Sequence, residues 1–292
     1  FSVASNPEFL REGAAIGDFM RPDRVVIGTD EGDDHALAIM KDLYRPLYLN
    51  ETPFVETNIP TAELSKYAAN AFLATKISFI NEISVLCESI DGDVQAIARA
   101  MGLDRRIGNK FLHAGPGFGG SCFPKDTLSA AFFARELGFE LGIVEAAIRA
   151  NERQRLHMID KLVAALDGEV EGKTVAILGL AFKPETDDIR EAPALDIVRG
   201  LIDRGAKVRA YDPAAMAEAG RQVPEMTLCK DAYEALADAD AMAIVTEWNE
   251  FRMLDLVRVK DLMSESRMVD MRNIYSASQM SEAGFQYFSV GR

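Results

Sequence analysis

The stretch Gly115–Asp126 combines a glycine-rich loop with a cysteine and reads Gly-Pro-Gly-Phe-Gly-Gly-Ser-Cys-Phe-Pro-Lys-Asp. Its four glycines let the backbone approach a ligand closely. Pro124 favours the first turn of a helix, so Cys122 stands just before a helix N-terminus, where the dipole stabilises a thiolate. Asp126 follows one turn later, within reach of the same centre. The alternative interpretation is a tight glycine turn with a cysteine that only packs.

Three further positions carry groups that covalent catalysis uses. Lys66 and Asn70 stand at i and i+4 on an expected helix, so they share one face. Both are costly to bury unless they are paired or used, and a solvated stripe is the alternative. Glu8 is a candidate general base, although Glu8 and Glu12 equally suit acids at the start of a helix, which their spacing favours.

A second loop, Gly179–Lys183, follows an expected strand and precedes a helix, which is the place of the phosphate loop in a Rossmann fold. It lacks G-x-G-x-x-G and therefore fails as a dinucleotide fingerprint. Lys183 instead offers a point charge to a phosphate, and Arg272, after a later strand, is a second candidate cation. Cys87 and Cys229 lie among apolar residues and are expected to be structural.

The elements that must position these groups divide the chain into three parts. Residues 1–58 hold too few strands for a domain and are interpreted as the tail of an N-terminal Rossmann-like, NAD-binding domain. Residues 59–166 form a central all-helical dimerisation domain with the cysteine loop. Its first helix, 60–90 with Thr61 as N-cap, is apolar nearly all round and should be buried in the protein or in a subunit interface. Residues 167–292 alternate strands and helices, which predicts a doubly wound parallel sheet.

Hydrophobic periodicity locates the other elements within this α/β chain. Strands are expected at 25–28, 54–57, 174–180, 207–211, 241–245 and 268–269. Helices are expected at 33–44, 94–101, 124–166 with a break near Gly138, 194–204, 214–220 and 231–237.

The composition excludes several classes of function. Of the 292 residues, 48% are hydrophobic and 27% are charged, which is an ordinary globular balance. The net charge of −14 argues against a nucleic-acid partner, although a few cations in a pocket suffice for a phosphorylated substrate. Three cysteines without a C-x-x-C pair, and three scattered histidines, predict no structural metal and favour a reducing cytoplasm. No apolar run approaches the roughly 18 residues of a membrane span.

Six motifs, taken in order and spacing, resemble the UDP-glucose/GDP-mannose dehydrogenase family. The match runs through the whole chain, and its details look more like the UDP-glucose enzymes of the family than the GDP-mannose ones. The motifs are Asn6–Gly13, Lys66 with Asn70, Arg106–Gly108, Gly115–Asp126, Phe182 with Lys183, and Asp270–Asn273.

The resemblance implies a four-electron oxidation of UDP-glucose to UDP-glucuronate by two NAD⁺. Two alternatives remain open: the substrate is GDP-mannose or a UDP-N-acetylhexosamine, or the chain is a UDP-sugar-binding module without catalysis. A mere binder needs no nucleophile, so Cys122, Lys66 and Asn70 favour the enzyme.

The resemblance also implies that residues 167–292 bind the UDP-sugar, and it implies roles for individual residues. Cys122 traps the aldehyde as a thiohemiacetal and then carries a thioester, while Lys66 and Asn70 stabilise the oxyanion. Asp126 manages protons through water and Glu8 assists hydrolysis. Arg106 is expected to reach into the site of the neighbouring subunit of a homodimer. The implied substrate-binding residues are Phe9, Leu10, Glu12, Arg106, Phe111, Leu112, Gly119, Phe182, Lys183 and Arg272.

Two departures from the family pattern bear on these expectations. His113 stands where related enzymes often carry Lys, which weakens a phosphate contact there. The amino-terminal βαβ half with its own G-x-G-x-x-G loop is not recognised, and the chain opens at Phe1 without an initiator Met. The expectation is therefore a fragment whose NAD site lies mostly outside the chain and which binds UDP-glucose weakly without turnover.

Overall fold

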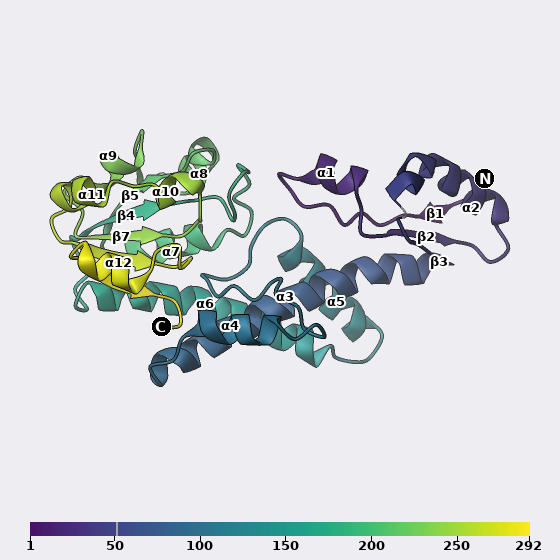
Figure 1. Cartoon of the computed structure of the whole chain (residues 1–292), viewed down its shortest axis with the longest axis horizontal. Coiled ribbons are helices and arrows are strands. Elements are labelled where there is room, and N and C mark those ends of the chain that lie inside the picture. Colours follow the sequence, from purple (N-terminus) through teal and green to yellow (C-terminus); the bar gives the residue numbers. More distant parts are fainter. Residues whose placement is uncertain (51) are drawn as a thin grey trace. The chain divides into compact units, whose positions relative to one another are not determined.

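The computed structural model describes residues 1–50 and 52–292, apart from the side chains of residues 48–50. These residues divide into two compact units, Phe1–Phe72 and Leu73–Arg292. Each unit contains its own sheet (Figure 1).

The first unit holds a three-stranded sheet in the order β1-β2-β3. β2 (Val25–Thr29) and β3 (Phe54–Asn58) pair in parallel close to the predicted positions, whereas the short β1 (Ala4–Ser5) pairs antiparallel with β2 and was not predicted. Its small core consists of Val25, Ile27 and Leu47. The helices of this unit are α1 (Ala15–Met20), α2 (Asp34–Leu43) and a 3-10 helix (Arg45–Asn50).

β3 continues directly into the long helix α3 (Ile59–Ser89). The prediction of Thr61 as N-cap is wrong, because the helix already begins at Ile59. The side chain of Asn58 accepts a hydrogen bond from the Thr61 backbone N–H at 2.9 Å and so serves the first turn. Residues 59–72 of α3 belong to the first unit and residues 73–89 to the second.

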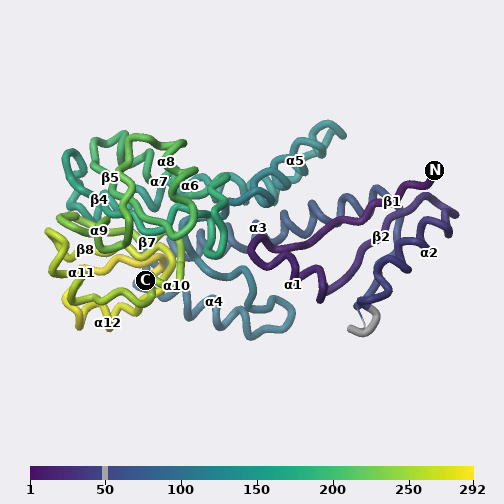
Figure 2. Tube along the Cα trace, turned by 90° about the horizontal axis from the view of Figure 1, so that it is seen from above, coloured from purple at the N-terminus to yellow at the C-terminus, as the bar shows by residue number. Residues whose placement is uncertain are grey.

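Three further helices of the second unit precede and follow the cysteine loop in sequence. α4 (Val94–Gly102) is capped by Asp93, and the predicted break near Gly138 separates α5 (Phe123–Glu136) from α6 (Gly142–Ala165). α5 extends away from the sheet of this unit (Figure 2). Its first turn follows the glycine loop directly.

The second sheet has six parallel strands in the order β6-β5-β4-β7-β8-β9. Numbered within the sheet, this is the strand order 3-2-1-4-5-6 of a doubly wound Rossmann-type fold, so the predicted fold class is confirmed. The strands are β4 (Thr174–Leu178), β5 (Lys207–Tyr211), β6 (Thr227–Leu228), β7 (Ala241–Ile244), β8 (Arg267–Asp270) and β9 (Gln286–Ser289).

Six helices connect these strands. The sequence did not predict α10, α11, α12, β6 or β9, since short elements carry too few residues to show a period. The helices are α7 (Pro193–Ile202), α8 (Met216–Gln222), α9 (Ala232–Leu236), α10 (Asn249–Arg252), α11 (Leu256–Leu262) and α12 (Ala277–Glu282).

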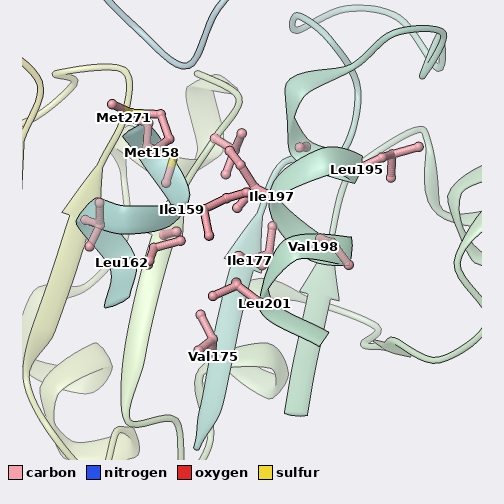
Figure 3. Close-up of a cluster of buried hydrophobic side chains, with 14 of the residues drawn as sticks. Met158, Ile159, Leu162, Val175, Ile177, Leu195, Ile197, Val198, Leu201 and Met271 are labelled. Carbon is pink, nitrogen blue, oxygen red and sulfur yellow. The ribbon is translucent and has the colours of Figure 1, made fainter. Parts of the chain in front are cut away.

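The central strand β4 explains the continuous apolar run in the sequence. Successive side chains of a strand point to opposite faces of the sheet. Val175 and Ile177 therefore join the cluster formed by α6 and α7, whereas Ala176 and Leu178 join the cluster on the other face. Figure 3 shows side chains of α6 and α7, among them Ile159, Leu162, Ile197 and Leu201, gathered around Val175 and Ile177.

Candidate active site

Cys122 is the N-cap residue of α5, as its sequence context predicts. Its carbonyl accepts the Asp126 backbone N–H at 2.9 Å, and Pro124 lies in the first turn. The thiol is half-buried, and the Ser121 hydroxyl oxygen lies 3.6 Å from its sulfur. Since unsatisfied N–H groups at a helix start favour negative charge, this place suits a thiolate.

Asp126 lies in the first turn of α5 and is almost fully buried, with 1% of its surface exposed. Its carboxylate is paired with the ammonium group of the exposed Lys125. A carboxylate so withdrawn from water needs such a partner to offset its lost hydration.

The glycine loop between Ala114 and Gly120 is buried and held by side chains of α3 and α6. Asn151 makes two hydrogen bonds with the Phe118 backbone. Its side-chain oxygen accepts the Phe118 N–H at 2.7 Å, and its side-chain nitrogen donates to the Phe118 carbonyl at 3.0 Å. Gln154 donates to the Gly115 carbonyl at 2.8 Å, and Asn81 accepts the Gly115 N–H at 2.9 Å.

The other side of the loop lies against residues 182–192, the segment after β4. A Cβ on Gly119 would lie 2.2 Å from the Glu191 carbonyl oxygen, and one on Gly120 would lie 2.7 Å from the Phe182 ring. Gly120 also donates its N–H to the Arg190 carbonyl at 2.8 Å. Glycine is therefore required at these two positions by close approach to another segment of the protein.

The predicted cation Arg272 is brought to this segment. Its guanidinium donates to the Phe182 carbonyl at 3.2 Å and to the Val245 carbonyl at 2.7 Å. A carboxylate oxygen of Glu247 lies 3.0 Å from Arg272 Nε, so the cation is held in place by an ion pair. The Lys183 ammonium lies 5.2 Å from the centre of the Phe182 ring.

A cavity of about 290 Å³ opens beside this cation. Leu112 and Arg272, both predicted to bind substrate, belong to its lining. The other polar side chains of its wall belong to Gln95, Arg99, Asn109, His113 and Asn273, and the apolar ones to Val94, Ala98, Leu112 and Ala114. A concave pocket with such a mixed lining and a cation suits a small polar organic ligand.

Phe111 has a left-handed backbone with φ of +63°, which is strained for a bulky residue. Its ring lies 6.0 Å from that of Phe123, the residue after the cysteine, and Phe118 lies 6.2 Å from Phe123 in an edge-on arrangement. These aromatic contacts connect the glycine loop to the start of α5.

In the first unit, the predicted residues Lys66 and Glu8 contact each other although they are far apart in sequence. Lys66 Nζ lies 2.8 Å from Glu8 Oε1 and 2.7 Å from the Glu8 carbonyl oxygen. The Glu8 carboxylate also accepts the Leu10 N–H at 2.6 Å. The Arg24 guanidinium lies 3.6 Å from the centre of the Phe9 ring, and the Lys66 ammonium lies 5.7 Å from it.

The interpretation of Glu8 and Glu12 as acids at a helix start is wrong. α1 begins only at Ala15 and has no side-chain cap, so Glu8 binds Lys66 instead. The solvated-stripe alternative for Lys66 and Asn70 is also wrong, because Asn70 is buried and only 16% of the Lys66 side chain is exposed.

Arg106 lies on an exposed turn after α4. Its guanidinium is bound by the Asp104 carboxylate at 2.6 Å, and 89% of the side chain is exposed. The hydrogen bonds that Arg106 donates to Asp104 raise the pKa of Arg106 above its ordinary value.

Several residues of the site were not predicted: Asn81, Asn151, Gln154, Arg155, Asp212 and Glu247. Asn151, Gln154 and Arg155 are spaced at i, i+3 and i+4 on α6, and polar groups sharing one face of a partly apolar helix were the signal that could have found them. Asp212, after β5, accepts N–H groups of Leu180, Ala181, Ala214 and Ala215 and of the Trp248 indole.

This use of Asp212 bears on dinucleotide binding. In a sheet that binds a dinucleotide, the acidic residue at the end of the second strand hydrogen-bonds the ribose of the cofactor. Here the acid is 1% exposed and committed to the loop after β4. Gly115, Gly117 and Gly120 do have G-x-G-x-x-G spacing, yet this loop follows α4 rather than a strand. Neither loop therefore has the context of a dinucleotide site.

Among the described residues, no group of His, Cys, Asp and Glu is arranged to hold a metal ion. In the same part of the chain, no helix is long and apolar enough to span a membrane.

The strand order and the cysteine loop together define a doubly wound α/β protein with a thiol at a helix start. Residues 1–48, 60–153 and 176–277 match, respectively, the NAD binding, central and UDP binding domains of the UDP-glucose/GDP-mannose dehydrogenase family. The chain belongs to this family, as its sequence motifs predict.

Three relatives illustrate how similar the chain is in sequence and in structure to other proteins. The UDP-glucose 6-dehydrogenases of Rhizobium meliloti and Bacillus subtilis (TuaD) are 52% and 50% identical over the whole chain, which covers 67% and 62% of their lengths. The structure of a UDP-glucose dehydrogenase from the hyperthermophilic archaeon Pyrobaculum islandicum superposes with a TM-score of 0.90 at 41% identity, with 100% of this chain and 64% of that chain covered. The chain thus spans about two thirds of the length of these relatives.

Proposed function

We propose that the protein containing this chain oxidises the C6 alcohol of UDP-glucose to the carboxylate of UDP-glucuronate. The observation that carries the proposal is Cys122, held at the N-terminus of α5 by a buried glycine loop. The relatives named for UDP-glucose are 52% and 50% identical, whereas a UDP-D-ManNAc dehydrogenase from Pyrococcus horikoshii is 27% identical. UDP-glucose is therefore preferred over an N-acetylated sugar.

NAD⁺ supplies the hydride acceptor for both oxidations, as the match of residues 1–48 to the NAD binding domain supports. The described residues contain no strand that leads through a G-x-G-x-x-G loop into a helix, so they do not provide its pyrophosphate site. In the proposed reaction, the residues of this chain therefore act on the sugar.

Covalent capture begins when the Cys122 thiolate adds to the aldehyde carbon and forms a C–S bond, and the carbonyl oxygen takes a proton. The hydroxyl oxygen then gives up its proton as hydride leaves that carbon for the acceptor, and a thioester remains. Water then adds to the thioester, the C–S bond breaks, and the carboxylate and the free thiol are released. The helix start lowers the cost of the thiolate at the beginning and at the end of the sequence.

We assign stabilisation of the oxyanion to Lys66 and Asn70, whose side chains are largely withdrawn from water. Glu8, which binds Lys66, assists hydrolysis, and the buried Asp126 manages protons through water. Phe9, Leu10, Glu12 and Gly119 are proposed to contact the sugar.

The nucleotide is proposed to lie against the second sheet, at the carboxyl ends of its strands. Lys183 and Arg272 would bind the phosphates, and Phe111, Leu112 and Phe182 would contact the rest of UDP. The cavity lined by Leu112 and Arg272 supports this proposal, as does the match of residues 176–277 to the UDP binding domain.

We also propose a homodimer built on α3. Within this chain α3 is buried on one side only: Ala74, Ile80 and Cys87 are buried, whereas the apolar Phe79 and Leu86 are 45% and 55% exposed, which leaves a subunit interface as the place expected for the other side. Phe79 and Leu86 stand seven residues apart, so they form one exposed stripe that a second copy can cover. Arg106, exposed in this chain, would reach the partner's site. Light scattering should give the mass of a dimer at micromolar concentration.

The test of the enzymatic proposal is Cys122→Ala in the whole protein, assayed by NADH formation from UDP-glucose. Without the nucleophile, the rate of acid formation should fall on the order of 10³-fold or more. Cys229→Ala removes a buried thiol from the second sheet and should keep most of the activity. Near-normal conversion to the acid by Cys122→Ala would contradict the assignment.

A further inference from the structure

Arg155 of α6 binds three segments of the second unit at once. Its Nη2 donates to the Phe118 carbonyl of the glycine loop and to the Glu191 carbonyl of the segment after β4, each at 3.0 Å. Its Nη1 is paired with the Asp196 carboxylate in the first turn of α7. Only 14% of the side chain is exposed, so these partners replace most of its hydration.

The junction around Arg155 is tight on every side. Glu191 has a left-handed backbone with φ of +52°, an uncommon conformation for a residue with a side chain. Its carbonyl oxygen, which accepts from Arg155, is also the atom that leaves no room for a Cβ at Gly119. A planar guanidinium spans two carbonyls and a carboxylate in fixed directions, which a lysine ammonium does not.

Both ends of the proposed substrate site depend on this junction. On one side, Phe118 packs on Phe123, the neighbour of Cys122. On the other side, residues 183–192 lead back to Phe182, whose N–H bonds the Asp188 carbonyl at 3.1 Å and whose ring borders Gly120. Arg155 therefore joins the segment that leads to the thiol with the segment whose residues are proposed to hold the nucleotide, beside the direct hydrogen bond from the Gly120 N–H to the Arg190 carbonyl.

We propose that Arg155 is a positioning residue that aligns the cysteine loop with the nucleotide-binding segment, so that a bound UDP-sugar lies with its reacting carbon at Cys122. This inference rests on the proposed function. Arg155 itself contacts no reacting atom in this scheme. A purely structural role, the pairing of α6 with α7 through Asp196, is the competing explanation, and it predicts different results in the experiment below.

The experiment measures alkylation of Cys122 by iodoacetamide in the described chain, followed by mass spectrometry of its peptide, without NAD⁺ so that no oxidation occurs. Wild type is compared with Arg155→Lys, which keeps the charge and loses the fork. The matched control is Arg153→Lys on the same helix, because Arg153 is 63% exposed and bound to Glu82. UDP affinity is measured in parallel by calorimetry, and folding by thermal unfolding.

In wild type and Arg153→Lys, saturating UDP-glucose should slow alkylation of Cys122 by about 5- to 150-fold, the usual range for coupled sites. Arg155→Lys should bind UDP within about threefold of wild type, a difference below 1 kcal/mol, yet lose most of this protection. Asp196→Asn leaves both carbonyl contacts of Arg155 in place and should keep the protection. If Arg155→Lys does not fold, Arg155→Gln, with one shorter neutral donor, takes its place.

Two results would overturn the inference alone: unchanged protection in the Arg155 variant, or a parallel loss of protection, UDP affinity and thermal stability, which marks a structural role. Absence of protection in the wild type despite bound UDP-glucose would instead contradict the proposed function, and the inference with it.

Discussion

Two stretches of the chain with the same proposed role are built in opposite ways. The glycine loop, 114–120, is buried at every residue and is hydrogen-bonded to side chains of α3 and α6. The segment 6–13 is half-buried or exposed at every residue, and its side-chain hydrogen bonds include those of Asn6, of Glu8 with Lys66 and of Arg11 with Asp18.

The difference indicates how each stretch contributes to binding. The glycine loop is formed by the fold itself, so a ligand meets it already ordered. The segment 6–13 lies nearer the surface, where its contacts compete with water, and any ordering of it by a ligand costs binding free energy. Disruption of the loop should therefore affect stability and binding together, whereas substitutions in the segment and at Lys66 should affect catalysis with little loss of stability.

The sharpest test of this contrast is Lys66→Met in the whole protein. Removal of one group that stabilises an oxyanion should lower kcat by roughly 10²- to 10³-fold. The free energy of unfolding should change by less than about 1 kcal/mol, since methionine keeps the apolar stem of the largely buried Lys66 and the lost partner Glu8 is exposed. Steady-state kinetics and urea unfolding measure the two effects. Lys41→Met, which removes the ion pair with Glu56 in the same unit, is the control. An unchanged kcat would remove Lys66 from the proposed mechanism.

Next in size is the effect of Lys183→Ala on nucleotide binding. A lost charge-assisted contact to a phosphate should weaken UDP by about tenfold to a hundredfold in titration calorimetry. Lys173→Ala, at the opposite end of β4 and paired with Asp240, should leave the affinity unchanged. NAD⁺ should give no detectable heat with the described chain. Tight binding of NAD⁺ without a response to UDP-glucose would reverse the proposed roles of the two sheets.

Gly119→Ala tests the buried side of the comparison. The added methyl group would meet the Glu191 carbonyl oxygen at 2.2 Å, and backbone cannot move aside cheaply. We expect a loss of about 1–3 kcal/mol in the free energy of unfolding, together with weaker binding of UDP. Gly17→Ala in α1 meets nothing within 4 Å and should be neutral or slightly stabilising in the same measurement. Equal effects of the two substitutions would remove the contrast between the stretches.

The smallest expected effect is on the free energy of unfolding at acidic pH. Glu88 of α3 is bound by Lys161 and His157 of α6, so it joins the two helices that support the glycine loop. Burial alone would raise the pKa of Glu88, but the hydrogen bonds from His157, Lys161 and the Gly291 N–H lower it to about 2.

Because the folded pKa lies below the ordinary value, this contribution to stability is present at neutral pH and is lost as pH falls from about 4.5 toward 2. Glu88→Gln should flatten the fall in unfolding free energy between pH 6 and pH 3 by about 1 kcal/mol, as measured by denaturant titration. An identical pH profile for variant and wild type would contradict this account.

Much of the fold was predictable from local signals. The apolar run after Lys173, the alternation of strands and helices, and the Gly138 break each depend on residues near one another in sequence. The predictions failed where the signal was short or shared. β1 and β9 have too few residues to show a period, and Asn58 took the capping role assigned to Thr61 because β3 runs directly into α3.

The same distinction, between signals that are local in sequence and contacts that are not, applies to the candidate site. Cys122, Pro124 and the glycines are adjacent, so their types and spacing determined by themselves that a thiol stands at a helix start after a loop that can approach a ligand. The family followed from six such local motifs in order. Which residues hold that loop was not determined locally, since Asn151 and Arg155 stand more than thirty residues away from Phe118.

Only the tertiary structure decided that Glu8 pairs with Lys66 and not with a helix start, and that Asp212 is committed to backbone N–H groups. It also decided that Arg155 joins the loop to the segment after β4. A charged or polar side chain has much the same local preference whether it ends in solvent, at a cap or on a buried carbonyl. The choice is made by the desolvation it must offset and by the partners that chain topology brings to it, and neither is present in the residues next to it in sequence.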